Sequence, residues 1–206
     1  DEVCAALAQE DREARIIAGG QTLAPLMAMR LARPELLIDI NDIAELQGIT
    51  VEGDEVVIKA ATRQRTAERS DIVAEQVPLL AAALPWVGHI QTRNRGTVGG
   101  SLANADPSAE IPLVAIALEA RVTLQSVSGQ RQLPVAEFLT APMETALRAD
   151  EVLTELRLPG RGEGRVGIGF EEVGIRAGDF AILAAAAEVV LDGDGKCRRA
   201  GFAVGG

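Results

Sequence analysis

Two glycine pairs, each placed after an apolar stretch, are the residues of this chain best suited to bind a ligand. They read Ala18-Gly19-Gly20-Gln21-Thr22 and Thr97-Val98-Gly99-Gly100-Ser101. Glycine adopts positive φ angles and lets a ligand approach main-chain N–H groups that a Cβ would otherwise cover. Successive N–H groups in such a turn form an anion site, and a helix that begins there adds partial positive charge. Together the two turns are suited to hold the two phosphates of a dinucleotide.

Both turns also have a purely structural explanation. A single Gly-Gly after a strand is most often a tight turn, and neither spacing matches G-x-G-x-x-G or the phosphate loop with its Gly-Lys pair. Hydroxyls at Thr22, Thr97 and Ser101 favour phosphate binding, because hydroxyl and N–H groups together bind phosphate oxygens. Arg93 and Arg95 flank the second pair, where they either add positive potential or form ion pairs with some of the 30 acidic residues.

Other chemically reactive groups are sparse. The chain has one histidine, His89, two cysteines far apart in sequence, Cys4 and Cys197, and no tyrosine. A zinc or iron–sulfur site made by this chain alone is therefore not expected. We predict no metal ligand and no catalytic residue, so that in an enzyme a bound cofactor would carry the reaction. Glu110 either binds a ribose or stands in the first turn of a helix, where an acidic residue is ordinary.

The composition indicates a soluble globular chain that does not bind nucleic acid. Of its 206 residues 48% are hydrophobic and 24% are charged. A net charge of -10 leaves no basic patch, and 2% aromatic residues leave few side chains to stack on bases. No apolar run is long enough to span a membrane, and the low cysteine content favours a cytoplasmic setting. The abrupt start at Asp1 and end at Gly206 predict a piece of a longer chain.

The first glycine pair is expected to lie in a βαβ-like unit. Strands are predicted over 14–18 and 36–40, with a helix over 23–31 between them. The strand over 14–18 is expected to be buried, and Met27 and Met29 are expected to pack in a core. The second pair is expected to form a turn of its own.

The rest of the chain adds hairpins, short helices and a linker. In order, we predict a hairpin over 50–60, helical pieces within 67–84 broken at Pro78, a helix over 112–118, a hairpin over 121–134, a strand over 152–158, a linker at 161–164, a strand over 166–173, a helix over 180–187 and strands over 188–191 and 200–204.

Three stretches resemble, in the same order, the FAD-binding medium subunit of molybdenum hydroxylases. These are 18–41 with its glycine pair and Arg33-Pro34, 93–107, and 176–181, which reads Arg-Ala-Gly-Asp-Phe-Ala. The family is typified by aerobic carbon monoxide dehydrogenase and is related to the xanthine dehydrogenase flavin domain. The resemblance implies an α+β fold, with a two-part FAD-binding domain of the PCMH (vanillyl-alcohol oxidase-like) type over 1–50 and 51–160. A partial small α+β C-terminal domain would follow over 165–206.

The resemblance also implies a set of FAD-binding residues. They are Ala18, Gly19, Gly20, Gln21, Thr22, Leu23, Thr97, Val98, Gly99, Gly100, Ser101, Ala103, Asp106, Glu110 and Leu153. The two glycine turns would hold the pyrophosphate, Glu110 would lie near the ribose, and Leu153 would lie against the flavin ring or the adenine. Glu171 and Glu172 follow Phe170, where some relatives have a lysine near the flavin.

The implied function is electron transfer within a larger complex. A large partner subunit with a molybdenum cofactor would oxidise the substrate, and a small partner subunit with [2Fe–2S] clusters would relay electrons to FAD on this chain. The acceptor would be a nicotinamide, a quinone or oxygen, and the assembly a dimer of heterotrimers. Two alternatives stay open: a free-standing flavin reductase of the same superfamily, and a non-catalytic assembly subunit that has lost FAD.

Overall fold

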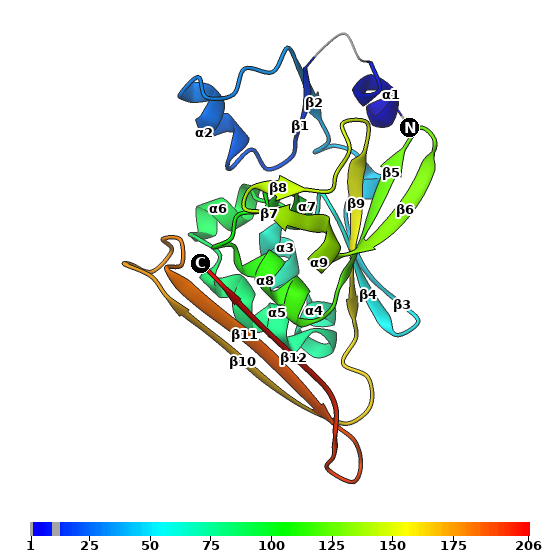
Figure 1. Ribbon diagram of the computed structural model, residues 1–206, viewed down its shortest axis with the longest axis vertical. Coiled ribbons are helices and arrows are strands. Elements are labelled where there is room, and N and C mark those ends of the chain that lie inside the picture. The colour runs from blue at the N-terminus through cyan, green and yellow to red at the C-terminus, as the bar shows by residue number, and fades with distance from the viewer. Residues whose placement is uncertain (1, 10–12) are drawn as a thin grey trace.

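The computed structural model of the chain describes residues 2–9 and 13–206 and has three parts (Figure 1). A five-stranded sheet and a three-stranded sheet enclose a layer of short helices, and a small parallel unit lies at the N-terminal side. The mixture of separate helices and mostly antiparallel strands confirms the predicted α+β class. In the described parts of the chain, no helix combines the length and apolarity needed to cross a membrane.

The N-terminal unit confirms the predicted strand–helix–strand order. It consists of α1 (Glu2–Leu7), β1 (Ala14–Ile17), α2 (Leu23–Ala28) and β2 (Leu36–Asp39), and β1 pairs with β2 in parallel. The predicted burial is wrong, because β1 is only half-buried, α2 has no buried residue and Met29 is 60% exposed. Two strands offer too small a face for a core of their own. The unit accordingly rests on a small cluster around Ile40, Leu46 and Ala61.

The five-stranded sheet has the strand order β3-β4-β9-β5-β6 and is antiparallel throughout. Its strands are β3 (Ile49–Glu52), β4 (Glu55–Lys59), β5 (Arg121–Ser126), β6 (Gly129–Pro134) and β9 (Val152–Pro159). Both predicted hairpins and the predicted strand over 152–158 are confirmed. Gly53 has a φ of 64° in the first hairpin, which suits a tight turn between β3 and β4.

Short helices connect the strands and supply the layer that packs on the inner face of this sheet. They are η1 (Ala44–Leu46), α3 (Gln64–Glu68), α4 (Asp71–Gln76), α5 (Pro78–Ala83), η2 (Leu84–Trp86), α6 (Ile90–Arg95), α7 (Val98–Asn104), α8 (Glu110–Ala117) and α9 (Val135–Phe138). The predicted break at Pro78 is confirmed, and this proline is the first residue of α5, where its missing N–H costs little. Helix α8 is apolar around nearly its whole circumference, which is typical of a buried helix.

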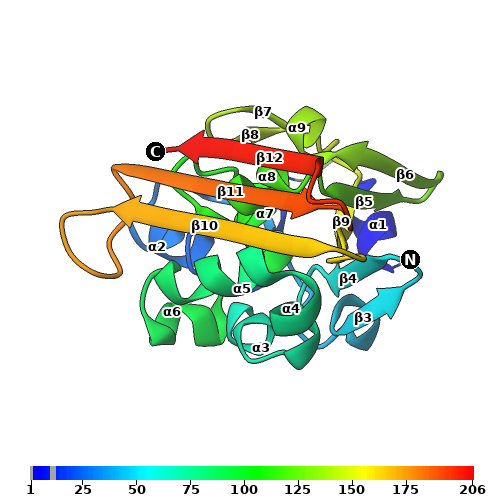
Figure 2. The same cartoon turned by 90° about the horizontal axis from the view of Figure 1, so that it is seen from below.

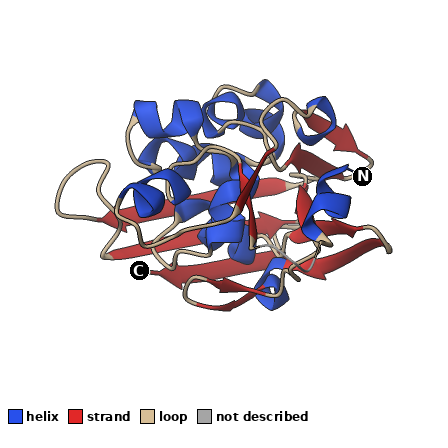
Figure 3. Ribbon diagram, turned by 90° about the horizontal axis from the view of Figure 1, so that it is seen from above, coloured by secondary structure: helices blue, strands red, loops and turns tan. Residues whose placement is uncertain are grey.

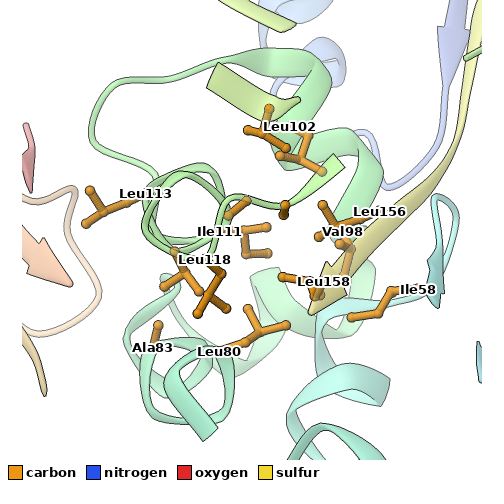
Figure 4. Packing of buried hydrophobic residues seen from close by; sticks show 14 of the residues in the cluster. Ile58, Leu80, Ala83, Val98, Leu102, Ile111, Leu113, Leu118, Leu156 and Leu158 are labelled. Atoms are coloured by element: carbon orange, nitrogen blue, oxygen red, sulfur yellow. The ribbon is translucent and has the colours of Figure 1, made fainter. Parts of the chain in front are cut away.

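The main core forms where α5, α7 and α8 meet the sheet. Figure 4 shows Leu80 of α5, Val98 and Leu102 of α7, and Ile111 of α8 packed together with strand residues such as Ile58, Leu156 and Leu158. This rigid layer carries the second glycine pair.

The three-stranded sheet covers the opposite side of α5 and α8 (Figure 2). It is an antiparallel meander of β10 (Arg165–Val173), β11 (Leu183–Leu191) and β12 (Cys197–Gly205). Seen from above in Figure 3, its strands run beneath the blue helices. Two very short strands, β7 (Leu139–Ala141) and β8 (Glu144–Thr145), complete the fold.

The predicted helix over 180–187 is wrong, because most of it belongs to β11. The alanines of this stretch have a high helix propensity, but tertiary packing overrides it. Ala184 and Ala186 are buried on the inner face of the sheet, where small side chains allow it to lie close to α8. The approach is closest at Gly201, where a Cβ would lie 1.8 Å from the main-chain oxygen of Ala117.

Candidate functional site

The two glycine pairs, distant in sequence, meet at one place in the structure. A Cβ on Gly19 would lie 2.4 Å from the main-chain oxygen of Arg95 and 2.7 Å from Cα of Gly96. No side chain fits in that space, so the first turn packs backbone against backbone on the segment that leads into α7. The structure thus brings the two predicted turns into a single site at the junction of the N-terminal unit and the helical layer (Figure 1).

The first turn leaves main-chain donors available. It connects β1 to α2, and Gly20 has a φ of 68°, a conformation that favours glycine. Within the described residues, no hydrogen bond is formed by the main-chain N–H groups of Gly20, Gln21 and Thr22. Thr22 precedes α2 without capping it through its side chain. A left-handed residue followed by unpaired N–H groups is the backbone arrangement found in anion-binding turns.

The second glycine pair is not a loop but the first turn of α7. Its main-chain donors are used within the protein: Val98 N–H donates to the oxygen of Thr62 (3.0 Å) and Gly99 N–H to that of Ala60 (2.8 Å). Gly100 N–H donates to the hydroxyl of Thr97, the N-cap residue (3.1 Å). The expectation of free N–H groups therefore holds for the first turn only.

The two glycines of α7 have different surroundings. A Cβ on Gly99 would lie 2.5 Å from Cβ of Ala60, so this glycine serves packing. Gly100 and the neighbouring Ala103 are exposed, and Ser101 is half-buried. The second pair therefore offers a ligand the open surface at Gly100 and the hydroxyl of Ser101, while Thr97 is buried and caps the helix.

Of the two explanations for Arg93, the ion pair is the correct one. Its side chain is 8% exposed, and Nε lies 2.8 Å from Glu68, while Nη1 donates to the main-chain oxygens of Val87 and Gly88. Burial opposes ionisation of Glu68, but hydrogen bonds from Arg93 and Arg65 outweigh it and hold its pKa below the usual value. The guanidinium of Arg93 is therefore engaged within the protein rather than directed at a ligand.

Two residues at the junction of the turns were missed by the sequence reasoning. Arg63 precedes α3, and its guanidinium donates to the main-chain oxygen of Arg95 and to Oδ1 of Asn41 (2.8 Å for the latter). Asn41 in turn donates from Nδ2 to the main-chain oxygen of Ala18 (2.8 Å). Asn41 lies 23 residues after Ala18 in the sequence, and no local sequence pattern signals this contact.

Acidic residues lie at the start of α8. Glu110 is 6% exposed, and burial raises its pKa to about 7, with the charges of Glu172 and Asp106 contributing. Burial also raises the pKa of Glu172, whose Oε2 has no hydrogen-bond partner among the described residues. Asp106 accepts a hydrogen bond from Ser108 N–H (2.9 Å), which is typical of a residue that caps a turn.

The remaining predicted residues have mixed surroundings. Leu153 is 5% exposed and belongs to the main core on β9. The third motif lies in the loop after β10, beside the start of α6, because a Cβ on Gly178 would lie 2.4 Å from the ring of His89. No cluster of three or more metal-binding side chains occurs in the part of the chain that the structure describes.

Comparison with known proteins identifies relatives over nearly the whole chain. Residues 1–161 match the family described as the FAD binding domain in molybdopterin dehydrogenase. The chain is 42% identical over 198 residues to the 6-hydroxypseudooxynicotine dehydrogenase complex subunit alpha of Paenarthrobacter nicotinovorans, covering 96% of this chain and 67% of that one. It is 41% identical over 180 residues to the carbon monoxide dehydrogenase medium chain of Hydrogenophaga pseudoflava, covering 87% and 62%.

Solved structures of similar enzymes superpose closely on this chain. The structure of carbon monoxide dehydrogenase from Hydrogenophaga pseudoflava, in a form that lacks the Mo-pyranopterin moiety, superposes with a TM-score of 0.93 at 38% identity, covering 99% of this chain and 70% of that one. Quinoline 2-oxidoreductase from Pseudomonas putida 86 superposes with a TM-score of 0.91 at 37% identity, with the same coverage. The chain spans about two thirds of the length of the relatives it matches.

Proposed function

The chain belongs to the family of FAD-binding domains of molybdopterin dehydrogenases, and we propose that it receives electrons from a partner subunit and delivers them to an external acceptor. Its relatives are subunits of carbon monoxide and xanthine dehydrogenase-type complexes, so it is an oxidoreductase subunit whose cofactor is FAD. Bound FAD supplies the redox chemistry, since it accepts and donates electrons. The residues of this chain bind, orient and shield it.

The site fits a pyrophosphate. One observation carries the proposal: the first turn, with its unpaired N–H groups at Gly20, Gln21 and Thr22, packs through Gly19 on the segment that begins α7. Main-chain donors in this arrangement bind phosphate oxygens. The half-buried hydroxyl of Ser101 on α7 adds a further donor.

The predicted residues take separate roles in this proposal. Ala18–Leu23 and the accessible residues Gly100, Ser101 and Ala103 of α7 border the pyrophosphate, while buried Thr97, Val98 and Gly99 fix the start of α7. Asp106 orders the turn that leads to Glu110. Glu110 accepts a hydrogen bond from a ribose hydroxyl, and Leu153 supports the site from the core. The division into FAD-binding parts at 1–50 and 51–160 and a C-terminal domain at 165–206 belongs to the same proposal.

The proposed partners follow from the kind of complex to which the relatives belong. Names such as "medium chain" and "complex subunit alpha" identify components of multi-subunit enzymes. We propose a large subunit with a molybdenum cofactor and a small subunit with [2Fe–2S] clusters, assembled as a dimer of heterotrimers in the cytoplasm. The acceptor is a nicotinamide, a quinone or oxygen.

The first test is whether the purified chain retains FAD. The chain is mixed with FAD, desalted and examined by visible absorption. We expect flavin bands that persist in the wild type and in Gly167→Ala, a position with nothing within 4 Å of an added Cβ. The bands should be lost in Gly20→Val, since a φ of 68° is strained for valine. A folded wild-type chain that releases all FAD would contradict the proposal and favour an assembly subunit without cofactor.

The second test concerns electron transfer. The FAD-loaded chain is mixed anaerobically with a chemically reduced two-cluster [2Fe–2S] subunit, and flavin absorbance is followed by stopped flow. We expect rapid bleaching with the reduced iron–sulfur subunit and none with the same subunit in its oxidised form. No bleaching by the reduced iron–sulfur subunit, together with fast bleaching by NADH, would instead identify a free-standing flavin reductase.

A further inference from the structure

We propose that Arg63 and Asn41 form a clamp that sets the spacing of the two glycine turns and places the charge of Arg63, which no ion pair of the described residues engages, beside the pyrophosphate site. This inference rests on the proposed binding of FAD. It concerns two residues outside the predicted binding set, and they act by positioning the turns. Three observations support it: the backbone pairing around Arg63, the hydrogen-bond chain through both side chains, and the distribution of charge.

The backbone around Arg63 is tied to the second turn. Arg63 and Thr97 form an isolated antiparallel bridge, and Gln64 N–H donates to the oxygen of Gly96 (2.9 Å). On the other side of the bridge, Val98 N–H donates to the oxygen of Thr62. Segment 60–64 therefore runs alongside segment 96–99, and Arg63 keeps a fixed position relative to α7.

The side chain of Arg63 then reaches the first turn through Asn41. One hydrogen-bond chain runs from the main-chain oxygen of Ala18 to Nδ2 of Asn41, from Oδ1 of Asn41 to the guanidinium of Arg63, and from the guanidinium to the main-chain oxygen of Arg95. Ala18 directly precedes the first glycine pair, and Arg95 lies just before Thr97. The chain therefore joins the two turns at the point where Gly19 packs on Arg95.

The side-chain types of Asn41 and Arg63 determine which group donates and which accepts in this hydrogen-bond chain. An amide has a donor end and an acceptor end: Asn41 donates to the main-chain oxygen of Ala18 and to the carboxylate of Asp39, and accepts from the guanidinium of Arg63. A guanidinium is planar and donates from several N–H groups, so one Arg63 binds two acceptors in a fixed geometry. A lysine keeps the charge but is not able to reproduce this fork.

The charge of Arg63 is the third observation. Arg93 and Arg65 share the single carboxylate of Glu68, which holds both guanidinium groups away from the two turns. Among the ion pairs of the described residues, none involves Arg63, which binds only uncharged oxygens and is half-buried. In a chain of net charge -10, this local positive charge favours an anion at the adjacent turn.

The test compares FAD binding by Arg63→Met, Arg63→Lys and Asn41→Ala in the apo chain. Equilibrium dissociation constants are measured from quenching of FAD fluorescence at several salt concentrations. Loss of a charge-assisted hydrogen bond predicts affinity weaker by about tenfold to a hundredfold for Arg63→Met, with a smaller dependence on salt. Arg63→Lys should keep the salt dependence of the wild type but bind more weakly. Asn41→Ala should weaken binding without changing the salt dependence.

A matched control separates positioning from general stability. Arg157 binds Glu52, Glu55 and Glu155 on the five-stranded sheet, so Arg157→Met removes an equally connected arginine elsewhere. We expect Arg157→Met to bind FAD as the wild type does. In the double variant of Arg63→Met and Asn41→Ala, the loss should be smaller than the product of the single losses, because both residues belong to one chain.

The outcomes distinguish this inference from the proposed function. A wild-type chain that binds FAD while Arg63→Met, Arg63→Lys and Asn41→Ala bind it equally well would overturn the clamp and leave the function intact. An equal loss in Arg157→Met would also overturn it. If the wild type does not bind FAD, the proposed function itself fails. Should Arg63→Met not fold, as judged by thermal unfolding, Arg63→Lys and Asn41→Ala still decide the question.

Discussion

Replacing Glu110 with glutamine should make the chain more stable at neutral and basic pH. Glu110 is 6% exposed at the start of α8, and burial is the largest cause that raises its pKa from 4.5 to about 7. Ionised Glu172 and Asp106 add to this effect, whereas Arg93 opposes it. Because the native state holds the proton more tightly than the unfolded state, ionisation of Glu110 opposes folding. Glutamine is similar in shape and never ionises.

The magnitude and its sign follow from the two pKa values. Below pH 4.5, Glu110 is protonated in both states and its titration does not affect stability. Between 4.5 and 7 the unfolded state releases its proton first, so the free energy of unfolding falls as pH rises. From the two pKa values of Glu110, 4.5 and about 7, the full penalty is about 3 kcal/mol, of which about 2.5 kcal/mol develops between pH 5 and pH 8.

The assay is urea unfolding of the wild type and Glu110→Gln at several pH values. Trp86 is the only tryptophan, and its ring lies 6.1 Å from that of Phe170 on β10, so its fluorescence reports the packing of the two layers. The stability difference between Glu110→Gln and the wild type should grow by about 2.5 kcal/mol from pH 5 to pH 8. A difference that stays level over this range would refute the reasoning.

A carboxylate with the opposite pKa shift provides the control. The side chain of Glu151 is 4% exposed, and hydrogen bonds from Arg131 hold its pKa below the usual value. Its contribution to stability is therefore present above pH 4.5 and is lost only as pH falls through its lower native pKa. Glu151→Gln should destabilise the chain by a similar amount at every pH from 5 to 8.

Two glycine substitutions test the close approaches that shape the molecule. Gly19→Ala should abolish FAD retention in the desalting assay, because its Cβ would lie 2.4 Å from the main-chain oxygen of Arg95. The control Gly167→Ala should retain FAD. Flavin retained by Gly19→Ala would contradict the proposal that close packing at Gly19 shapes the binding site. Gly201→Ala should lower the free energy of unfolding in urea by about 1–3 kcal/mol, because β12 must move away from Ala117 of α8. An unchanged urea midpoint for Gly201→Ala would contradict this prediction, because it would mean that β12 moves away from α8 with no loss of folding free energy.

Features that depend on neighbouring residues were predictable from the sequence. The turn at Gly53, the break at Pro78 and the parallel unit around the first glycine pair all rest on local conformational preferences, and each is confirmed. Assigning both glycine pairs to one ligand predicted that they lie close together, and Gly19 does pack on Arg95 and Gly96. The family resemblance added the order of the three motifs, and the comparisons confirm that family and the cofactor.

Features that depend on distant partners were not predictable. The alanines of β11 favour a helix by themselves, and only contact with α8 makes a strand the better solution. The N–H groups of α7 looked available because Ala60 and Thr62, which accept them, lie far away in sequence. Arg63 had no recognisable signal, since its importance depends on Asn41 and Arg95 approaching it from two other segments.

The shallow burial of the N-terminal unit has a consequence for its motion. Helix α2 has no buried residue, and the two strands beside it are only half-buried, so little apolar contact opposes local unfolding of this unit. A ligand held between Gly20 and α7 would contact both the N-terminal unit and the helical layer. It would supply the buried contacts that the protein residues alone do not form between them. Amide hydrogen exchange over residues 14–39 should therefore slow when FAD binds, while exchange in β4 and β9 stays the same. The cofactor would then complete the folding of the segment that binds it.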